Sequence, residues 1–172
     1  MRSEHLTLAV VGTGAMGRGI AQIAAQAGCR VLLLDTREGA AAEAKAALGK
    51  QWGKLVEKGK MAAAAAEAAQ ARLEIVADAY GLTYANVVVE AIVENLDVKR
   101  ALFRELDEIV SADCVMATNT SSLSVTAIAA GTKFPGRVAG FHFFNPVPVM
   151  KLVEVVAGAL TDIPGSSDVI DR

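Results

Sequence analysis

Cysteine and aromatic residues are scarce in this sequence. Its 172 residues include 2 cysteines, and aromatic residues make up 5%. Two cysteines are too few for a disulfide framework, and since Cys29 and Cys114 lie in apolar runs we expect buried free thiols in a reducing compartment. The 53% hydrophobic content comes largely from small aliphatic residues, which suits helices packed on a sheet and argues against disorder.

The chain also lacks a large excess of either charge and a long apolar segment. Lysine and arginine total 17 and aspartate and glutamate 19, so the net charge of −2 argues against a nucleic-acid partner. The longest uncharged span, 114–132, is rich in serine and threonine, unlike a membrane helix. The apolar run 6–11 leads into glycines rather than a cleavage site. We therefore expect a cytoplasmic protein without a membrane partner.

The order of apolar runs predicts one α/β domain. Strand-like runs at 6–11, 30–34, 73–76, 86–90, 114–117 and 137–143 alternate with helical segments. This alternation is typical of a Rossmann-like, doubly wound, mostly parallel sheet. The seven-residue loop 144–150 is too short for a parallel crossover, so we expect the final strand, 151–156, to return antiparallel.

A glycine-rich loop follows the first predicted strand. It has the pattern G-x-G-x-x-G and consists of Gly12, Thr13, Gly14, Ala15, Met16 and Gly17. The glycines permit a tight turn, close approach to a pyrophosphate and close packing of the following helix, whose N-terminus favours phosphate. Asp35 would bind the adenosine ribose and repel a 2′-phosphate, which predicts NAD as cofactor. Arg37 could tolerate a 2′-phosphate, although a surface arginine is the simpler interpretation.

A helical hairpin is predicted after the second strand. Residues 38–59 carry an apolar stripe at helical spacing, and the alanine-rich segment 61–72 favours a second, antiparallel helix. Away from the stripe, Lys50, Lys54 and Lys58 form a row four residues apart. This row either meets the phosphates of a large anionic substrate or is a solvated face.

Polar residues also follow the fifth predicted strand. That strand delivers Thr118–Ser122 to the carboxyl edge of the sheet, where open α/β folds bind ligands. The same residue types favour a turn and an N-cap for the short helix 125–129. Both interpretations stay open.

The closing segment holds the only histidine in an apolar setting. His142 lies near the end of the sixth predicted strand, and an antiparallel return would bring Glu154 beside it. Because Glu154 shares its strand face with Leu152 and Val156, we expect a buried carboxylate that needs a partner. The alternatives are a core histidine bonded to backbone and a surface glutamate on an edge strand. His5 is the only other histidine, so no metal site is predicted.

Four segments together resemble the L-3-hydroxyacyl-CoA dehydrogenase family. They are the glycine-rich loop and its helix (12–21), Val89–Asn95, Asn119–Leu123 and His142–Val155. The resemblance covers the chain to about residue 158 and implies an NAD-dependent oxidoreductase of fatty acid metabolism. Such an enzyme oxidises L-3-hydroxyacyl-CoA to 3-oxoacyl-CoA, as in β-oxidation, and also catalyses the reverse reduction.

The resemblance implies roles for individual residues. His142 would be the general base that takes the 3-hydroxyl proton, Glu154 would hold its imidazole, and Ser121 would hydrogen-bond to the substrate oxygen. Residues that match cofactor-site positions beyond the glycine loop and Asp35 are Glu94, Lys99 and Asn119. In that family the hairpin contributes to acyl-CoA binding, which assigns Lys50 and Lys54 to the substrate. The resemblance also assigns Ser121 and Asn145 to the substrate.

The family also suggests how the chain is divided. We expect residues 1–158 to form the NAD-binding domain and 159–172 to be a linker-like tail toward an absent C-terminal helical domain. That domain would supply dimer contacts and part of the substrate site, so we expect a homodimer for the full-length protein and little activity from this chain alone. One alternative is a non-catalytic, crystallin-like NAD-binding relative. Another is a dehydrogenase of a different small hydroxy acid.

Overall fold

Strands and helices alternate along most of the chain. The computed structural model describes residues 5–162 and 170–171. Its elements are β1 (Thr7–Val11), α1 (Ala15–Gln26), β2 (Arg30–Leu34), α2 (Ala40–Glu57), α3 (Ala63–Ala71), β3 (Leu73–Ile75), the 3₁₀ helix η2 (Ala79–Leu82), β4 (Val87–Glu90), α4 (Leu96–Ile109), β5 (Val115–Thr118), α5 (Val125–Ala129), the 3₁₀ helix η3 (Pro135–Arg137), β6 (Val138–Phe143), β7 (Leu152–Ala157) and β8 (Ile170–Asp171). The expected order of strands and helices is confirmed.

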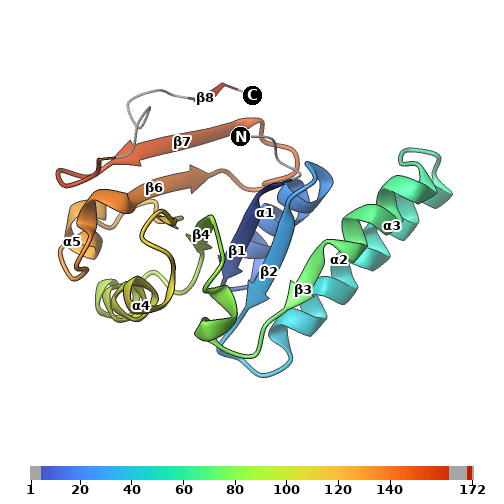
Figure 1. Ribbon diagram of the computed structural model, residues 1–172. Coiled ribbons are helices and arrows are strands. Elements are labelled where there is room, and N and C mark those ends of the chain that lie inside the picture. The colour runs from blue at the N-terminus through green and yellow to red at the C-terminus, as the bar shows by residue number, and fades with distance from the viewer. Residues whose placement is uncertain (1–4, 163–169, 172) are drawn as a thin grey trace.

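The strands form one twisted sheet. Within the described residues its order is β3-β2-β1-β4-β5-β6-β7-β8. The first six are parallel to their neighbours, whereas β7 and β8 are antiparallel (Figure 1). The Rossmann-like fold and the antiparallel return are therefore confirmed. The chain reverses its direction of winding between β1 and β4, and ligands of such sheets bind at the carboxyl ends of strands at this point.

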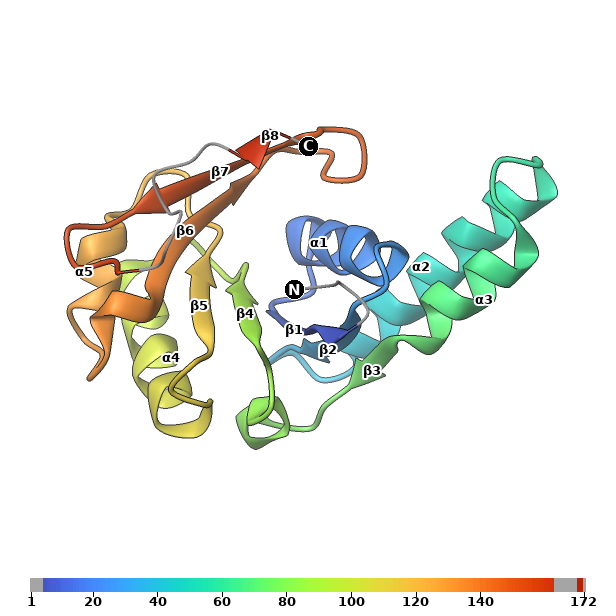
Figure 2. The same ribbon diagram turned by 45° about the horizontal axis from the view of Figure 1, so that its top comes forward.

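Helices cover both faces of the parallel part of the sheet, as Figure 2 shows. Alternate residues of β1 serve the two layers: Val10 packs in the core with α1 and α2, while Ala9 and Val11 pack in the core with α4 and α5. Burial on both faces explains why β1 is a continuous apolar run rather than an alternating one.

The predicted helical hairpin is present. Leu48 and Trp52 of α2 are buried, and α2 and α3 lie side by side and project beyond β3 (Figure 1). Gly59 turns the chain between them with a φ of +65°, a conformation that favours glycine. Lys50 and Lys54 lie on the exposed face of α2. No helix in the described part of the chain is long and apolar enough to cross a membrane.

The buried face of α4 combines apolar and charged residues. Leu106 is fully buried and Leu102 and Ile109 pack partly buried against the core, whereas Val98 is 44% exposed. The helix also buries Phe103 and two charged residues, Lys99 and Asp107. Val98 is exposed because this side of α4 faces a cleft at the sheet edge, which Val98 and Leu102 line.

A buried ion pair fastens the start of β6 to α4. Asp107 is 6% and Arg137 is 8% exposed, and an Nη2 of Arg137 lies 2.6 Å from Oδ1 of Asp107. The Asp107 carboxylate also accepts a hydrogen bond from the backbone N–H of Lys133, and Arg137 donates to the Ser111 carbonyl. This pair fixes the loop that leads into β6, the strand that carries His142.

We predict that Asp107→Ala lowers the free energy of unfolding by about 3–5 kcal/mol, because it leaves the Arg137 guanidinium buried without its counter-ion. Urea denaturation followed by circular dichroism measures the change. The double variant Asp107→Leu with Arg137→Met should lose less than the single variant. As a control, Glu74→Ala at the exposed Arg30–Glu74 pair should cost no more than about 1 kcal/mol. Equal losses for Asp107→Ala and Glu74→Ala would contradict the prediction.

Candidate active site and nucleotide cleft

Two cavities meet at the carboxyl edge of the sheet. The first, here the β2 cavity, has a volume of about 480 Å³ and is lined by residues that include Gly12, Gly14 and Asp35. The second, here the β6 cavity, has a volume of about 380 Å³ and is lined by residues that include Ser121 and His142. Ala91 and Ile92 line both cavities, so the two are direct neighbours at the ends of β1 and β4, and together they are here called the cleft.

The glycines of the loop differ in their surroundings: two are packed against backbone and one opens on the cleft. A Cβ at Gly12 would lie 2.6 Å from the carbonyl oxygen of Ala91, and one at Gly17 would lie 1.8 Å from the carbonyl oxygen of Gly12. Both glycines therefore allow close packing within the protein. A Cβ at Gly14 would have no neighbour within 4 Å, so this position opens on the cleft. Because α1 starts at Gly14 without a side-chain cap, the N–H groups of Ala15 and its neighbours are placed for an anion.

Asp35 holds the glycine loop in place. Its Oδ2 accepts hydrogen bonds from the N–H and the hydroxyl of Thr13, at 2.7 and 2.8 Å, and its Oδ1 accepts from the Arg37 N–H at 3.0 Å. Although burial raises the pKa of Asp35, these hydrogen bonds outweigh it and hold that pKa below its usual value. Asp35 is therefore ionised at neutral pH. The Arg37 guanidinium is paired with Glu43 at 2.6 Å, which favours the interpretation of a surface arginine.

His142 and Glu154 stand directly opposite each other on β6 and β7. They are register partners, and Nδ1 of His142 lies 2.9 Å from Oε2 of Glu154. The imidazole also packs on the Phe144 ring, with centroids 4.5 Å apart. With Nδ1 engaged, Nε2 is the ring nitrogen that is left for a ligand in the β6 cavity.

The expectation of a buried carboxylate at Glu154 is wrong. Its side chain is 47% exposed, compared with 25% for His142. The reason is the place of β7, which lies outside the parallel part of the sheet with only the two-residue β8 beyond it, whereas α5 packs against β6. Solvent weakens the attraction in such a pair relative to a buried one, so the contribution of Glu154 lies more in orienting the imidazole than in binding energy.

The polar segment after β5 joins three strands rather than capping α5. Asn119 donates its N–H to the Glu90 carbonyl, and its side-chain oxygen accepts from the Phe143 N–H at 2.9 Å. The N-cap of α5 is Ser124, which lies outside the predicted cluster. Ser121 is exposed and lines the β6 cavity together with Asn119 and His142. Capping of α5 therefore does not account for the cluster, although the Thr120 hydroxyl accepts a hydrogen bond from the Leu123 N–H at 2.9 Å, as in the predicted turn.

A buried charged network beneath the cleft was missed by the sequence interpretation. Glu90 and Thr118 are fully buried and Lys99 is 1% exposed. The Lys99 ammonium lies 2.5 Å from Glu90 Oε1, while the Thr118 hydroxyl and the Ile92 N–H donate to the same carboxylate at 2.8 and 2.7 Å. A glutamate at the end of the apolar strand 87–90 was the available signal, because a carboxylate there needs a buried partner.

Lys99 sits behind the cleft wall rather than in it. Its ammonium is 3.7 Å from Glu94 Oε1, and Glu94 also accepts hydrogen bonds from the Thr120 hydroxyl at 2.8 Å and the Ser121 N–H at 3.3 Å. Glu94 itself lines the β6 cavity. The structure thus places Glu94, Asn119 and Ser121 on the cleft surface, and Lys99 approaches only Glu94 among them, from beneath.

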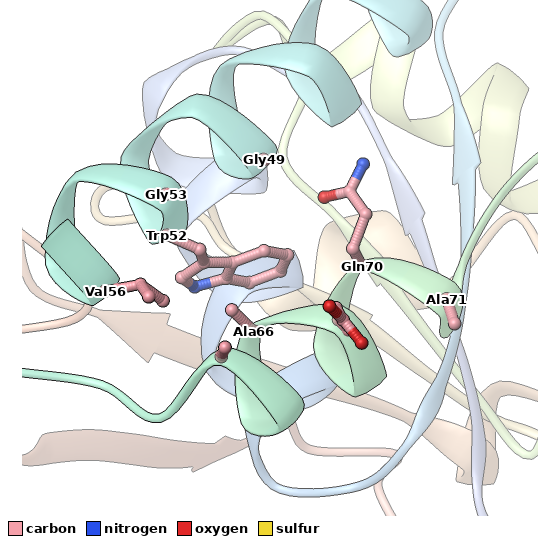
Figure 3. Close-up of a pocket in the computed structure, with 9 residues that line it drawn as sticks. Gly49, Trp52, Gly53, Val56, Ala66, Gln70 and Ala71 are labelled. Atoms are coloured by element: carbon pink, nitrogen blue, oxygen red, sulfur yellow. The ribbon is translucent and has the colours of Figure 1, made fainter.

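Another cavity, of about 520 Å³, lies between α2 and α3 (Figure 3). Small residues such as Gly49 and Gly53 line it, and the Trp52 indole fills one side. It contains no residue of the cleft. Lys50 and Lys54 lie on the same hairpin but line none of these cavities, so the structure does not bring them together with His142.

Comparison with known proteins agrees with the fold and identifies a family. A family model described as "3-hydroxyacyl-CoA dehydrogenase, NAD binding domain" matches residues 7–170. A 3-hydroxyadipyl-CoA dehydrogenase of Escherichia coli (strain K12) is 48% identical over 155 residues, which are 90% of this chain and 33% of that protein. A 3-hydroxybutyryl-CoA dehydrogenase of Clostridioides difficile is 44% identical over 156 residues, 91% of this chain and 56% of that protein.

A solved structure indicates the same family. The crystal structure of 3-hydroxybutyryl-CoA dehydrogenase from Escherichia coli K12 substr. MG1655 superposes with a TM-score of 0.91 at 46% identity, covering 94% of this chain and 34% of that one. The chain thus spans only part of the length of the relatives it matches. It belongs to the 3-hydroxyacyl-CoA dehydrogenase family, and the part of the family that it represents is the NAD-binding domain.

Proposed function

We propose that this chain serves the NAD-dependent interconversion of L-3-hydroxyacyl-CoA and 3-oxoacyl-CoA as the nucleotide-binding domain of the enzyme. The observation that carries the proposal is the His142–Glu154 pair, at 2.9 Å, with His142 lining a cavity that adjoins the glycine-loop cavity. The names of the relatives, which are dehydrogenases of 3-hydroxyacyl-CoA esters, support it. A protein that only bound NAD would have no need of this pair.

The residues of the cleft fit a nicotinamide dinucleotide. Open space at Gly14 and the uncapped start of α1 suit a pyrophosphate, and the ionised Asp35 suits ribose hydroxyls. Glu94 and Asn119 would face the nicotinamide end, because they line the β6 cavity with His142. When bound, NAD supplies the hydride acceptor.

His142 is proposed as the general base. The Nδ1–H donates to Glu154, so Nε2 carries the lone pair that can take the proton of a 3-hydroxyl group. The carboxylate then stabilises the imidazolium that forms. Ser121, exposed in the same cavity, is proposed to donate its hydroxyl to the substrate oxygen. In the reverse direction the imidazolium would return the proton.

The hairpin is proposed to bind the CoA phosphates. Lys50 and Lys54, with Lys58 one turn further, stand on the exposed face of α2 and its end. No ion pair with a carboxylate within the described residues occupies these ammonium groups. They are therefore free to meet phosphate in solution.

We also propose a cellular location, a pathway and a role for the C-terminal residues. Cys29 and Cys114 are buried free thiols, and burial raises the pKa of Cys114 to about 11, which suits a reducing, cytoplasmic location. Fatty acid β-oxidation is the proposed pathway because its chemistry includes oxidation of 3-hydroxyacyl-CoA. The linker role of 159–172 and dimer formation through a further domain are proposed because the relatives are longer than this chain.

Two glycine variants should separate stability from nucleotide binding. Gly17→Ala should lower the free energy of unfolding, because its Cβ would strike the Gly12 carbonyl. Gly14→Ala should leave the free energy of unfolding within about 0.5 kcal/mol of the parent and weaken NADH binding at least roughly tenfold, since its Cβ enters the cleft. Urea denaturation and NADH fluorescence titration measure the two effects. Gly14→Ala with unchanged NADH affinity would place the pyrophosphate elsewhere.

Asp35 should set the preference for NADH over NADPH. In Asp35→Ala the ratio of the dissociation constant for NADPH to that for NADH should fall by about tenfold or more, because a charge facing the 2′-phosphate is removed. Since hydrogen bonds lower the pKa of Asp35, its carboxylate stays charged at and above the usual carboxyl pKa. The parent's preference for NADH should therefore be lost only as pH falls through that lowered pKa. Calorimetric titrations at several pH values test both points. Equal affinity of the parent for both nucleotides at pH 7 would rule out this role.

His142→Gln should abolish turnover without affecting NADH binding. We expect a loss of about 100- to 10,000-fold in reduction of acetoacetyl-CoA, measured in a longer protein that joins this chain to the remaining domain of the relatives. NADH affinity should stay within about twofold, because glutamine keeps the polar contact. His5→Gln is the matched control, since His5 is exposed and outside the cleft. A His142→Gln enzyme of normal rate would exclude the proposed base.

A further inference from the structure

A buried ion pair lies beneath the β6 cavity and takes no part in the proton transfer proposed above. Glu90, at the end of β4, is fully buried, and Lys99 of α4 is 1% exposed. Nζ of Lys99 lies 2.5 Å from Oε1 of Glu90. Removing two charges from water has a large cost, and apolar side chains of similar size are often as stable in such a place. Stability alone therefore does not explain the pair.

The pair commits the Lys99 ammonium to Glu90 rather than to the cleft surface. The second nearby carboxylate, that of Glu94, lies farther from the ammonium, at 3.7 Å. Two further donors fix the Glu90 carboxylate, namely the Ile92 N–H at 2.7 Å and the Thr118 hydroxyl at 2.8 Å. Because two carboxylates share one ammonium, the group of Glu90, Lys99 and Glu94 keeps one net negative charge.

That net charge reaches the β6 cavity through Glu94. The Glu94 side chain is 40% exposed and lines the cavity. Among the lining residues that the structure describes, only Glu94 and His142 have ionisable side chains. Glu154 bonds to the imidazole without lining the cavity, and solvent screens its half-exposed carboxylate. Glu94 is therefore the carboxylate that a ligand in this cavity meets.

The two redox states of the proposed cofactor differ in the charge of one ring. The nicotinamide ring of NAD⁺ is a cation, whereas that of NADH is neutral, and the rest of the molecule is the same. A carboxylate beside the ring attracts the cation alone, by an amount that the water around Glu94 reduces. An ammonium that was free to neutralise this carboxylate would weaken the attraction. The cleft can thus distinguish the oxidised from the reduced cofactor by charge.

We infer that Glu90 raises the affinity of the cleft for NAD⁺ relative to NADH, because it neutralises Lys99 and leaves the Glu94 charge to act on the nicotinamide ring. Glu90 touches no ligand and acts through two other side chains, so it is a positioning residue. The inference rests on the proposed function, which places the nicotinamide beside His142. Its consequence is that binding of the oxidised cofactor and release of the reduced one are both favoured.

The first test replaces the Glu90 carboxylate by an amide of the same shape. Glu90→Gln keeps an oxygen for the Ile92 N–H and for Lys99, and the Thr118 hydroxyl can accept from the amide, but the negative charge is removed. Lys99 then pairs with Glu94, so the ratio of the dissociation constant for NAD⁺ to that for NADH should rise about fivefold. Calorimetric titration measures both constants. Adenosine diphosphate ribose, which lacks the nicotinamide ring, should bind within about twofold of the parent.

A second variant removes the same charge at the cleft surface. Glu94→Gln changes a partly exposed side chain, so its result does not depend on how the core accepts Glu90→Gln. It should also raise the ratio about fivefold. The matched control is Glu105→Gln, because Glu105 is exposed and lines the β2 cavity, away from the proposed nicotinamide. The ratio in this control should equal that of the parent.

The affinity ratios decide the inference separately from the proposed function. An unchanged ratio in Glu94→Gln, or in a Glu90→Gln chain that circular dichroism shows to be folded, overturns the inference while nucleotide binding by the parent leaves the proposed function standing. An equal loss for NAD⁺, NADH and adenosine diphosphate ribose in Glu90→Gln would assign Glu90 a purely structural role and overturn it too. A larger change of the ratio in Glu105→Gln than in Glu94→Gln would place the nicotinamide in the β2 cavity. A parent that binds neither nucleotide would contradict both.

Discussion

The antiparallel pairing of β6 with β7 is the constraint on which the geometry of the His142–Glu154 pair depends. Parallel neighbours bring only their carboxyl ends to the ligand edge. A long crossover joins the end of one such strand to the start of the next, at the opposite edge of the sheet. A short return loop instead sets residues of β7 directly beside the end of β6. The register places Glu154 opposite His142, and a slip of one residue would move Glu154 to the other face of the sheet. One hydrogen-bonded pair thus follows from strand register.

Three carboxylates at this edge differ because their surroundings differ. Glu90 is enclosed with Lys99 and Thr118 and acts as a fixed support beneath the cleft. Asp35 is partly buried and is kept ionised by the hydrogen bonds of the loop it anchors. Glu154 is half-exposed and holds an imidazole. The same chemical group therefore supports the cleft wall, orients an imidazole or, in the proposed function, binds the ribose, according to its depth and partners.

The fold was largely predictable because its signals are local. Continuous apolar runs such as 6–11 and 86–90 indicate strands buried on both faces, and the short loop after Phe143 indicates the antiparallel return. The glycine loop and Asp35 were predictable for the same reason. The apolar and polar pattern of the sequence could not predict the exposure of Glu154, because that exposure depends on how far the helices extend over the sheet. Nor could it show that Lys99 lies under the cleft wall, because a lysine in an amphipathic helix usually faces solvent.

In the proposed function a dinucleotide lies along the cleft with its nicotinamide beside His142 and its adenine in the β2 cavity, which Val98 and Leu102 of α4 line. Nuclear Overhauser contacts in the chain saturated with NADH test this most directly. We predict contacts from the nicotinamide C4 protons to the ring protons of His142 or Phe144, and from the adenine C2 or C8 proton to the methyl groups of Val98 or Leu102. The opposite pattern, with adenine contacting His142, would contradict the account.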